Sequence, residues 1–145
     1  MHDCPDEVWS DQTREPQFWY LVYHTLFWLD YSLSESPDGF APPAPFGLEE
    51  FDPAGVVPDR VYTKAEMQIY LEHGRQKTRA AIFGLTDEKA QTRFQYFSKN
   101  FSILELMLYN MRHVQHHAAQ LNLLLRQDGA EPPSWVSRAD PKLEV

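Results

Sequence analysis

The distribution of proline constrains the fold of this chain more than any other feature of its sequence. The 11 prolines lie at positions 5, 16, 37, 42, 43, 45, 53, 58, 132, 133 and 141, so two long proline-free stretches remain, residues 17–36 and 59–131. Proline removes a backbone donor and clashes with the preceding helical turn. Long helices are therefore confined to these two stretches, and the sequence predicts an all-α fold.

The expected elements are three long helices, at residues 17–33, 63–84 and 102–128, and a shorter helical segment from Thr86. The first is apolar almost all the way round, which requires cover on more than one face. The other two long helices each begin with a capping box, Thr63 with Glu66 and Ser102 with Glu105, in which two side chains satisfy free amides at the helix start. Strand-like alternation is convincing nowhere, so no strand is predicted.

A segment rich in proline, glycine and acidic residues, 34–60, separates the first two long helices. Loops of this length are usually functional or mobile. Phe40, Phe46 and Phe51 are spaced through it, which predicts that it packs down onto the rest of the protein. Residues 130–145 form a C-terminal tail. At 145 residues the chain has the size of one domain, so we expect a single helical domain over residues 1–145.

Charge and composition exclude several classes of function. The chain has 13 basic and 21 acidic residues, a net charge of −8, which disfavours nucleic-acid binding. No apolar run approaches the ~20 residues of a membrane span. Cys4 is the only cysteine, which excludes an internal disulfide and zinc or redox sites of the CxxC type. We expect a cytoplasmic protein with neither nucleic acid nor membrane as a partner.

Two histidines on the last predicted helix have the spacing of metal ligands. His113 and His117 are four residues apart, so they project within about 40° of each other and can place two ring nitrogens ~2.0–2.1 Å from one divalent ion. An apolar arc lies about a quarter-turn away. It comprises Ile103, Met107, Met111, Val114, Ala118, Leu121 and Leu125. We expect this arc to be the buried face and the histidines to lie at its margin.

His24, in the middle of the first long helix, is the best candidate for a third ligand. No acidic residue shares its face, and Asp30 points to the opposite side. A charged imidazolium would be costly there, whereas a neutral, metal-bound imidazole would be satisfied. Two simpler interpretations stay open. His113 and His117 could be a chance i,i+4 pair, and His24 could be a core histidine held by hydrogen bonds. His73 and His116 are expected to be solvated.

The stretch MRHVQHHAAQLNLLLRQ, residues 111–127, resembles the last-helix motif of the DinB-like superfamily of metalloenzymes. The resemblance extends through VYTKAEMQIYLEHGRQK and LTDEKA and covers roughly residues 16–128. It implies an up-down-down-up four-helix bundle with one metal-binding histidine on the second helix, matched by His24, and two on the fourth, matched by His113 and His117. The chain departs from the family at Ala118-Ala119, where members often have Arg-Gly. Only residues 5–12 are available for the first helix, so we expect that helix to be truncated or very short.

The resemblance also implies a divalent metal, which a three-histidine site accepts as Zn, Ni, Co or Fe. Relatives are metal-dependent hydrolases, or transferases and isomerases that use a low-molecular-weight thiol such as mycothiol, bacillithiol or glutathione. No carboxylate on the histidine face is an obvious general base, which favours thiol activation over hydrolysis. The expected walls for a small organic substrate are Tyr20, Phe27, Trp28 and Tyr31. Gln120 is expected to position substrate or to orient a ligand.

Two alternatives remain. The chain could be a non-catalytic helical dimer that retains the bundle, or a structural metal-binding protein. The helix at residues 17–33, apolar on all sides, favours a homodimer under every reading.

Overall fold

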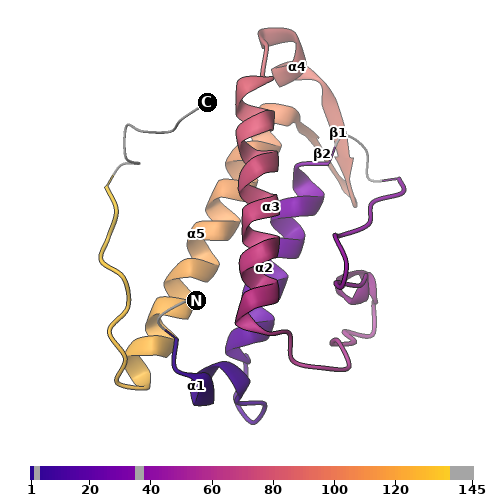
Figure 1. Cartoon of the computed structure of the whole chain (residues 1–145). Coiled ribbons are helices and arrows are strands. Elements are labelled where there is room, and N and C mark those ends of the chain that lie inside the picture. The colour runs from indigo at the N-terminus through magenta and orange to yellow at the C-terminus, as the bar shows by residue number, and fades with distance from the viewer. Residues whose placement is uncertain (2–3, 35–37, 138–145) are drawn as a thin grey trace.

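Three long helices lie side by side and form the body of the protein (Figure 1). The computed structural model describes residues 1, 4–34 and 38–137. The long helices are α2 (Phe18–Ser32), α3 (Lys64–Phe83) and α5 (Ile103–Gln127). The short elements are α1 (Asp6–Ser10), the 3-10 turn η1 (Glu49–Phe51), α4 (Asp87–Gln91), and the strands β1 (Arg93–Tyr96) and β2 (Lys99–Ser102). The expected helical architecture is confirmed.

The long helices do not all run in the same direction. In Figure 1, α2 and α3 run upward and α5 runs downward, which matches the second, third and fourth helices of the expected bundle. In the place of a first helix the structure has α1, which is five residues long. A four-helix up-down-down-up bundle with a truncated or very short first helix stays a prediction.

The helix boundaries follow the local signals in the sequence. Both capping boxes form: the Thr63 hydroxyl accepts from the Glu66 amide and the Glu66 carboxylate accepts from the Thr63 amide, and Ser102 and Glu105 do the same for α5. The Thr86 side chain caps α4. Because these contacts lie within one turn, they form without help from distant parts of the chain.

α2 is the central helix, and it packs against both α3 and α5. Of its 15 residues, 11 are buried. Its approach to α3 depends on Gly74, where a Cβ would lie 2.9 Å from a terminal methyl of Leu29. The apolar character of α2 on all sides is therefore satisfied within one chain. It no longer argues for a second subunit, and the homodimer stays a prediction.

The long segment between α2 and α3 packs onto the helices through its phenylalanines, as expected. Phe46 stacks on Tyr70 with 4.4 Å between ring centroids, and the Phe51 ring lies 5.0 Å from that of Phe27. These contacts place η1 against α2. Residues 35–37 of this segment and residues 138–145 of the predicted tail lie outside the described residues.

The prediction of no strands is wrong. β1 and β2 form an antiparallel hairpin in which Phe94 pairs with Phe101, and Phe97 has a φ of 52° at the turn. Phe94 and Tyr96 point inward and are buried with Leu106 of α5. Each strand has only four residues. An alternation of apolar and polar residues over such a short stretch has only two inward positions, which is too few to be recognised in the sequence.

The prediction for the buried face of α5 is also wrong. Leu106 and Asn110, on the same face of the helix as His113 and His117, are buried at 1% and 4% exposure. Met111, in the middle of the apolar arc, is 52% exposed, although Leu125 at the end of that arc is buried. The face that carries the histidines packs against α2, and much of the arc lies outside that contact and remains exposed to solvent.

Candidate metal centre

The packing of α2 against α5 brings three histidine side chains to one point. Nε2 of His113 lies 3.3 Å from Nε2 of His24 and 3.0 Å from Nε2 of His117. One nitrogen from each ring lies within 4.8 Å of the other two. The rings are steeply inclined to one another, at 81° between His24 and His117. The three rings thus present their edges to a common centre.

Hydrogen bonds on the far side of two of these rings fix where their protons lie. Nδ1 of His24 lies 2.7 Å from Oε2 of Glu50, and Nδ1 of His117 lies 2.6 Å from Oε1 of Gln120. Both partner oxygens can only accept, so each Nδ1 carries the proton and donates it. The Nε2 lone pairs of His24 and His117 therefore point into the centre, as metal ligands require.

The third ring, His113, lies deepest between the other two. Burial, helped by the neighbouring His117 and His24, lowers the pKa of His113 to about 4, so this ring is neutral at pH 7. Among the described residues its Nδ1 atom is buried without a hydrogen-bond partner. Tetrahedral nitrogen ligands at about 2.1 Å from zinc lie about 3.4 Å apart, close to the 3.3 and 3.0 Å between Nε2 of His113 and those of the other two rings. The donor set therefore fits one divalent ion.

Glu50 is the residue that the sequence reading missed. It lies on η1 with its side chain 4% exposed, and it accepts hydrogen bonds from His24, from Nε1 of Trp28 at 2.7 Å and from the Tyr20 hydroxyl. Burial acts to raise the pKa of Glu50, but the hydrogen bonds from these three side chains lower it overall. No acidic residue lies on the face of α2 that carries His24, as expected. The acidic partner of His24 comes instead from the segment between α2 and α3. The available signal was an acidic pair, Glu49-Glu50, beside a phenylalanine predicted to pack down.

A comparison with protein families identifies the family of the chain. The model of the DinB superfamily matches residues 1–121, which include all three histidines and Gln120. The chain belongs to the DinB superfamily. No curated protein matches the sequence. Membership confirms the resemblance carried by the last-helix motif.

In this DinB superfamily protein, the four predicted substrate walls divide into two pairs. The ring centroids of Tyr20 and Trp28 lie 6.5 and 6.3 Å from that of His24, and both side chains are half-buried. Phe27 and Tyr31 are 0% and 5% exposed and pack against phenylalanines of the loop. The structure thus places Tyr20 and Trp28 beside the histidines, and Phe27 and Tyr31 in the core beneath.

His73 on α3 and His116 on α5 are not part of the three-histidine centre. His116 is exposed on α5, as expected, and its ring is 5.0 Å from that of His117. His73 was expected to be solvated, and its side chain is 39% exposed, but Nε2 also lies 3.2 Å from Oδ1 of the buried Asp30. Neither His73 nor His116 contributes a nitrogen to the group formed by His24, His113 and His117.

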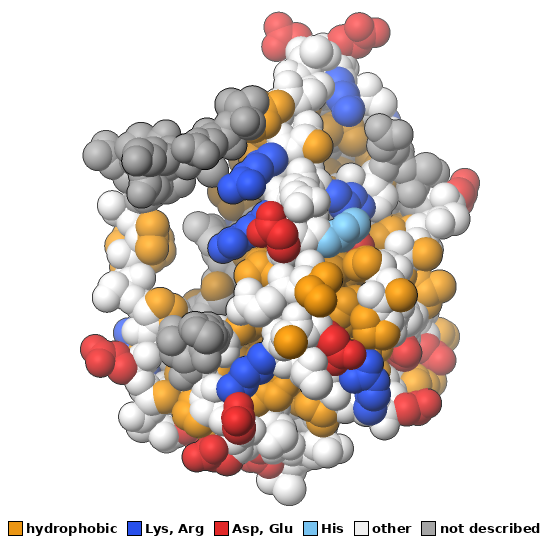
Figure 2. Space-filling view, in the orientation of Figure 1, with side chains coloured by type: hydrophobic (Ala, Val, Ile, Leu, Met, Phe, Trp, Pro, Cys, Tyr) orange, Lys and Arg blue, Asp and Glu red, His pale blue; other side chains and the backbone are white. Residues whose placement is uncertain are grey.

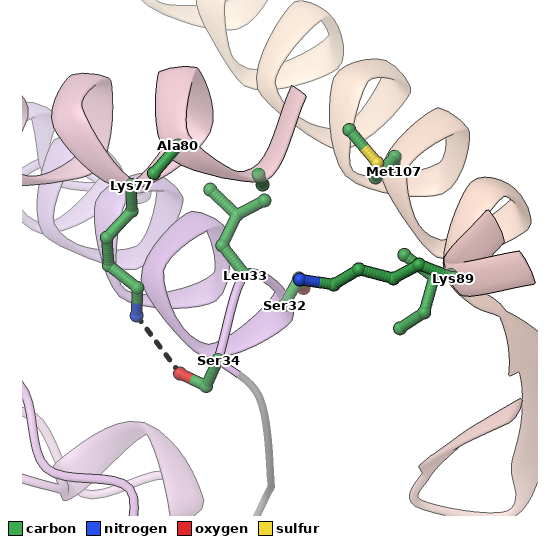
Figure 3. A pocket seen from close by; sticks show the side chains of 9 residues that line it. Ser32, Leu33, Ser34, Lys77, Ala80, Lys89 and Met107 are labelled. Atoms are coloured by element: carbon green, nitrogen blue, oxygen red, sulfur yellow. Dashed lines mark hydrogen bonds between the residues drawn. The ribbon is translucent and has the colours of Figure 1, made fainter. Parts of the chain in front are cut away.

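A separate pocket of about 280 Å³ lies at the C-terminal end of α2 in this DinB superfamily protein (Figure 3). Its walls come from the end of α2, from α3 and from the start of α5, and include Leu33, Ala80 and Met107. Lys77 and Lys89 reach toward the last turn of α2, and Lys77 donates to the Ser34 hydroxyl at 3.1 Å. Cations stabilise the negative C-terminal end of a helix. Lys77 also pairs with the buried carboxylate of Asp30.

Proposed function

We propose that this member of the DinB superfamily is a metal-dependent enzyme that binds one divalent ion through His24, His113 and His117. The observation that carries the proposal is the convergence of three Nε2 atoms, with separations of 3.0 and 3.3 Å for the two closest pairs. Two of the three lone pairs are directed by hydrogen bonds on the far side of the ring. Neutral imidazoles suit Zn, Ni, Co and Fe, so availability decides among them.

The arrangement favours a small-thiol-dependent S-transferase over a hydrolase. A divalent ion held by three histidines supplies Lewis-acid activation of a thiol or a carbonyl when bound. A hydrolase also needs a free base near the open side of the site. Among the described residues, the one carboxylate that contacts the three converging histidines, Glu50, lies behind His24 and accepts from three side chains at once. Tyr20 and Trp28 flank the site and offer apolar surface to a small organic substrate.

Metal content is the direct test. Protein purified without chelator is analysed for metals, and we expect about one ion per chain in the wild type. His113→Ala removes the central ligand and should lose the ion. His116→Ala, three residues along the same helix and exposed, should retain it. A wild type without stoichiometric metal would contradict the proposal.

The reaction type is tested on the metal-loaded protein. Consumption of bacillithiol, mycothiol or glutathione in the presence of an electrophile, absent in His113→Ala, supports the transferase. Hydrolysis of ester or amide substrates without any use of thiol supports the hydrolase instead. If the protein binds metal but shows neither thiol consumption nor hydrolysis, the result supports the alternative of a structural metal-binding protein.

Neither a membrane nor a nucleic acid is proposed as a partner. Among the described residues, no helix has the length and apolar character that a membrane span requires. The net charge of −8 is unfavourable for phosphate binding. A homodimer remains part of the proposal, because Ile82 and Phe83 of α3 and Met111 of α5 are each more than half exposed. Light scattering coupled to size exclusion measures that directly.

A further inference from the structure

Glu50 contacts a proposed metal ligand without being one itself. Its carboxylate lies on the Nδ1 side of His24, and the other two histidines lie on the Nε2 side. An ion at the centre is therefore separated from Glu50 by the imidazole ring. Any influence of Glu50 on the ion passes through His24.

The three ligands differ in what stands behind them. Behind His24 is a buried carboxylate, behind His117 is the neutral amide of Gln120, and Nδ1 of His113 has no partner among the described residues. An anion that accepts from Nδ1 makes the opposite nitrogen a stronger donor to a metal. His24 is thus the ligand whose strength depends most on its partner.

The carboxylate is also held in place. Nε1 of Trp28 donates to the same Oε2 atom that faces His24, and the Tyr20 hydroxyl donates to the carboxylate as well. Tyr20, His24 and Trp28 are each four residues apart, so they lie on one face of α2. Three donors from one helix face therefore converge on a single acidic side chain from the loop.

We propose that Glu50 is a positioning residue of the metal centre: it holds His24 with the proton on Nδ1 and Nε2 directed at the ion, and it strengthens the binding of that ion. The proposal rests on the metal site of the proposed function. It adds a residue outside the histidine set, on a different segment of the chain.

The neighbouring residue provides a matched control. Glu49 lies on the same 3-10 turn and carries the same charge, but its Oε2 accepts from the Tyr23 hydroxyl at 3.1 Å rather than from a histidine. Glu49→Gln and Glu50→Gln make the same chemical change one residue apart. Only the second alters the partner of a proposed ligand.

The first measurement is the Zn²⁺ dissociation constant, obtained by competition with a chromogenic chelator. Loss of an outer partner of a ligating histidine typically weakens metal affinity by about 10–100-fold, and we expect this for Glu50→Gln. Glu49→Gln should stay within about threefold of the wild type, since its partner is a tyrosine. Equal affinity in Glu50→Gln and the wild type overturns the proposal.

The second measurement needs no metal. In ¹⁵N NMR spectra of the metal-free protein, the His24 ring should show the proton on Nδ1 in the wild type and in Glu49→Gln, and a changed protonation pattern in Glu50→Leu, which has no acceptor for that proton. If even the wild type binds no Zn²⁺, the proposed function fails, while this spectrum still decides the role of Glu50. An unchanged His24 signal in Glu50→Leu refutes that role.

A variant that keeps the charge controls for loss of folding. Glu50→Asp keeps the charge but shortens the side chain by one methylene, so the carboxylate sits farther from Nδ1. We expect Zn²⁺ affinity between those of the wild type and Glu50→Gln, with the circular dichroism melting curve close to that of Glu49→Gln. Wild-type affinity in a folded Glu50→Asp that no longer shows the proton on Nδ1 of His24 would overturn the proposal.

Discussion

Nδ1 of His117 lies 2.6 Å from Oε1 of Gln120, one turn further along α5. The bond holds the ring with Nε2 toward His24 and His113, so we predict that Gln120→Ala weakens Zn²⁺ binding by about 10-fold. Chelator competition measures the change. Gln115→Ala, exposed on the same helix, is the control and should leave the affinity unaltered. Equal affinities for the two variants would show that the amide plays no part in metal binding.

The stability of the metal-free protein should fall in mildly acidic solution. The pKa of His113 is about 4 when folded, below its ordinary value of 6.5, because burial disfavours the charged ring. The unfolded chain therefore takes up a proton first as the pH falls, and the stabilising contribution present above pH 6.5 is lost progressively toward pH 4. Between pH 7 and pH 5 we expect a loss of about 1–2 kcal/mol in the free energy of unfolding.

Urea titrations of the chelator-treated protein measure this loss. His113→Gln removes this titrating ring and should reduce the dependence between pH 7 and pH 5, leaving the part contributed by His117, whose pKa burial also lowers. The comparison is confined to that range because protonation of the carboxylates Glu50, Glu66 and Glu105, whose pKa values are all lowered, contributes at lower pH. If the free energy of unfolding changes with pH equally in His113→Gln and in the wild type, other groups cause the effect.

Asp30 is a buried charge that depends on Lys77. The carboxylate is 1% exposed and contacts Nζ of Lys77, with the Tyr70 hydroxyl donating to its other oxygen at 3.2 Å. Lys77→Met leaves this carboxylate without its cation and should cost about 3–5 kcal/mol of unfolding free energy. Adding Asp30→Asn should restore part of the loss, because the charge is removed as well. Additive losses in the double variant would mean that the two groups do not interact.

The corrected orientation of α5 has its own test. Leu106 is 1% exposed, so Leu106→Ala should destabilise the protein by about 2–5 kcal/mol. Met111 is 52% exposed, and Met111→Ala should change stability by less than about 1 kcal/mol. Denaturant unfolding measures both. A larger loss at Met111 would support the sequence expectation that the apolar arc is buried, for instance in a dimer.

The helices could be predicted because their signals are local. The capping boxes at Thr63 and Ser102 act within one turn, and the proline-free stretches limit where helices can extend. The β hairpin and the buried face of α5 could not be predicted in the same way. Which side of α5 is covered depends on the helix that packs against it, and that helix is α2 alone over most of its length.

The candidate site was predictable only in part, for a related reason. His113 and His117 are visible as a pair through their spacing, and His24 through its position on an apolar helix without an acidic neighbour and through the family resemblance. Glu50 lies 26 residues from His24 in a segment with no regular pattern. Its place in the structure is decided by the packing of Phe46 and Phe51, and aromatic contacts of that kind are set by the tertiary fold rather than by local sequence.

Two of the proposed ligands are far apart in the sequence: His24 and His113 are separated by 89 positions, yet their Nε2 atoms lie 3.3 Å apart. An ion held by both acts as a cross-link that closes most of the polypeptide into one ring, and the chain entropy saved by such a link grows with the length enclosed. The free energy of binding then becomes free energy of folding. Metal loading would tie the second helix to the last one, so that neither could detach while the ion stays bound.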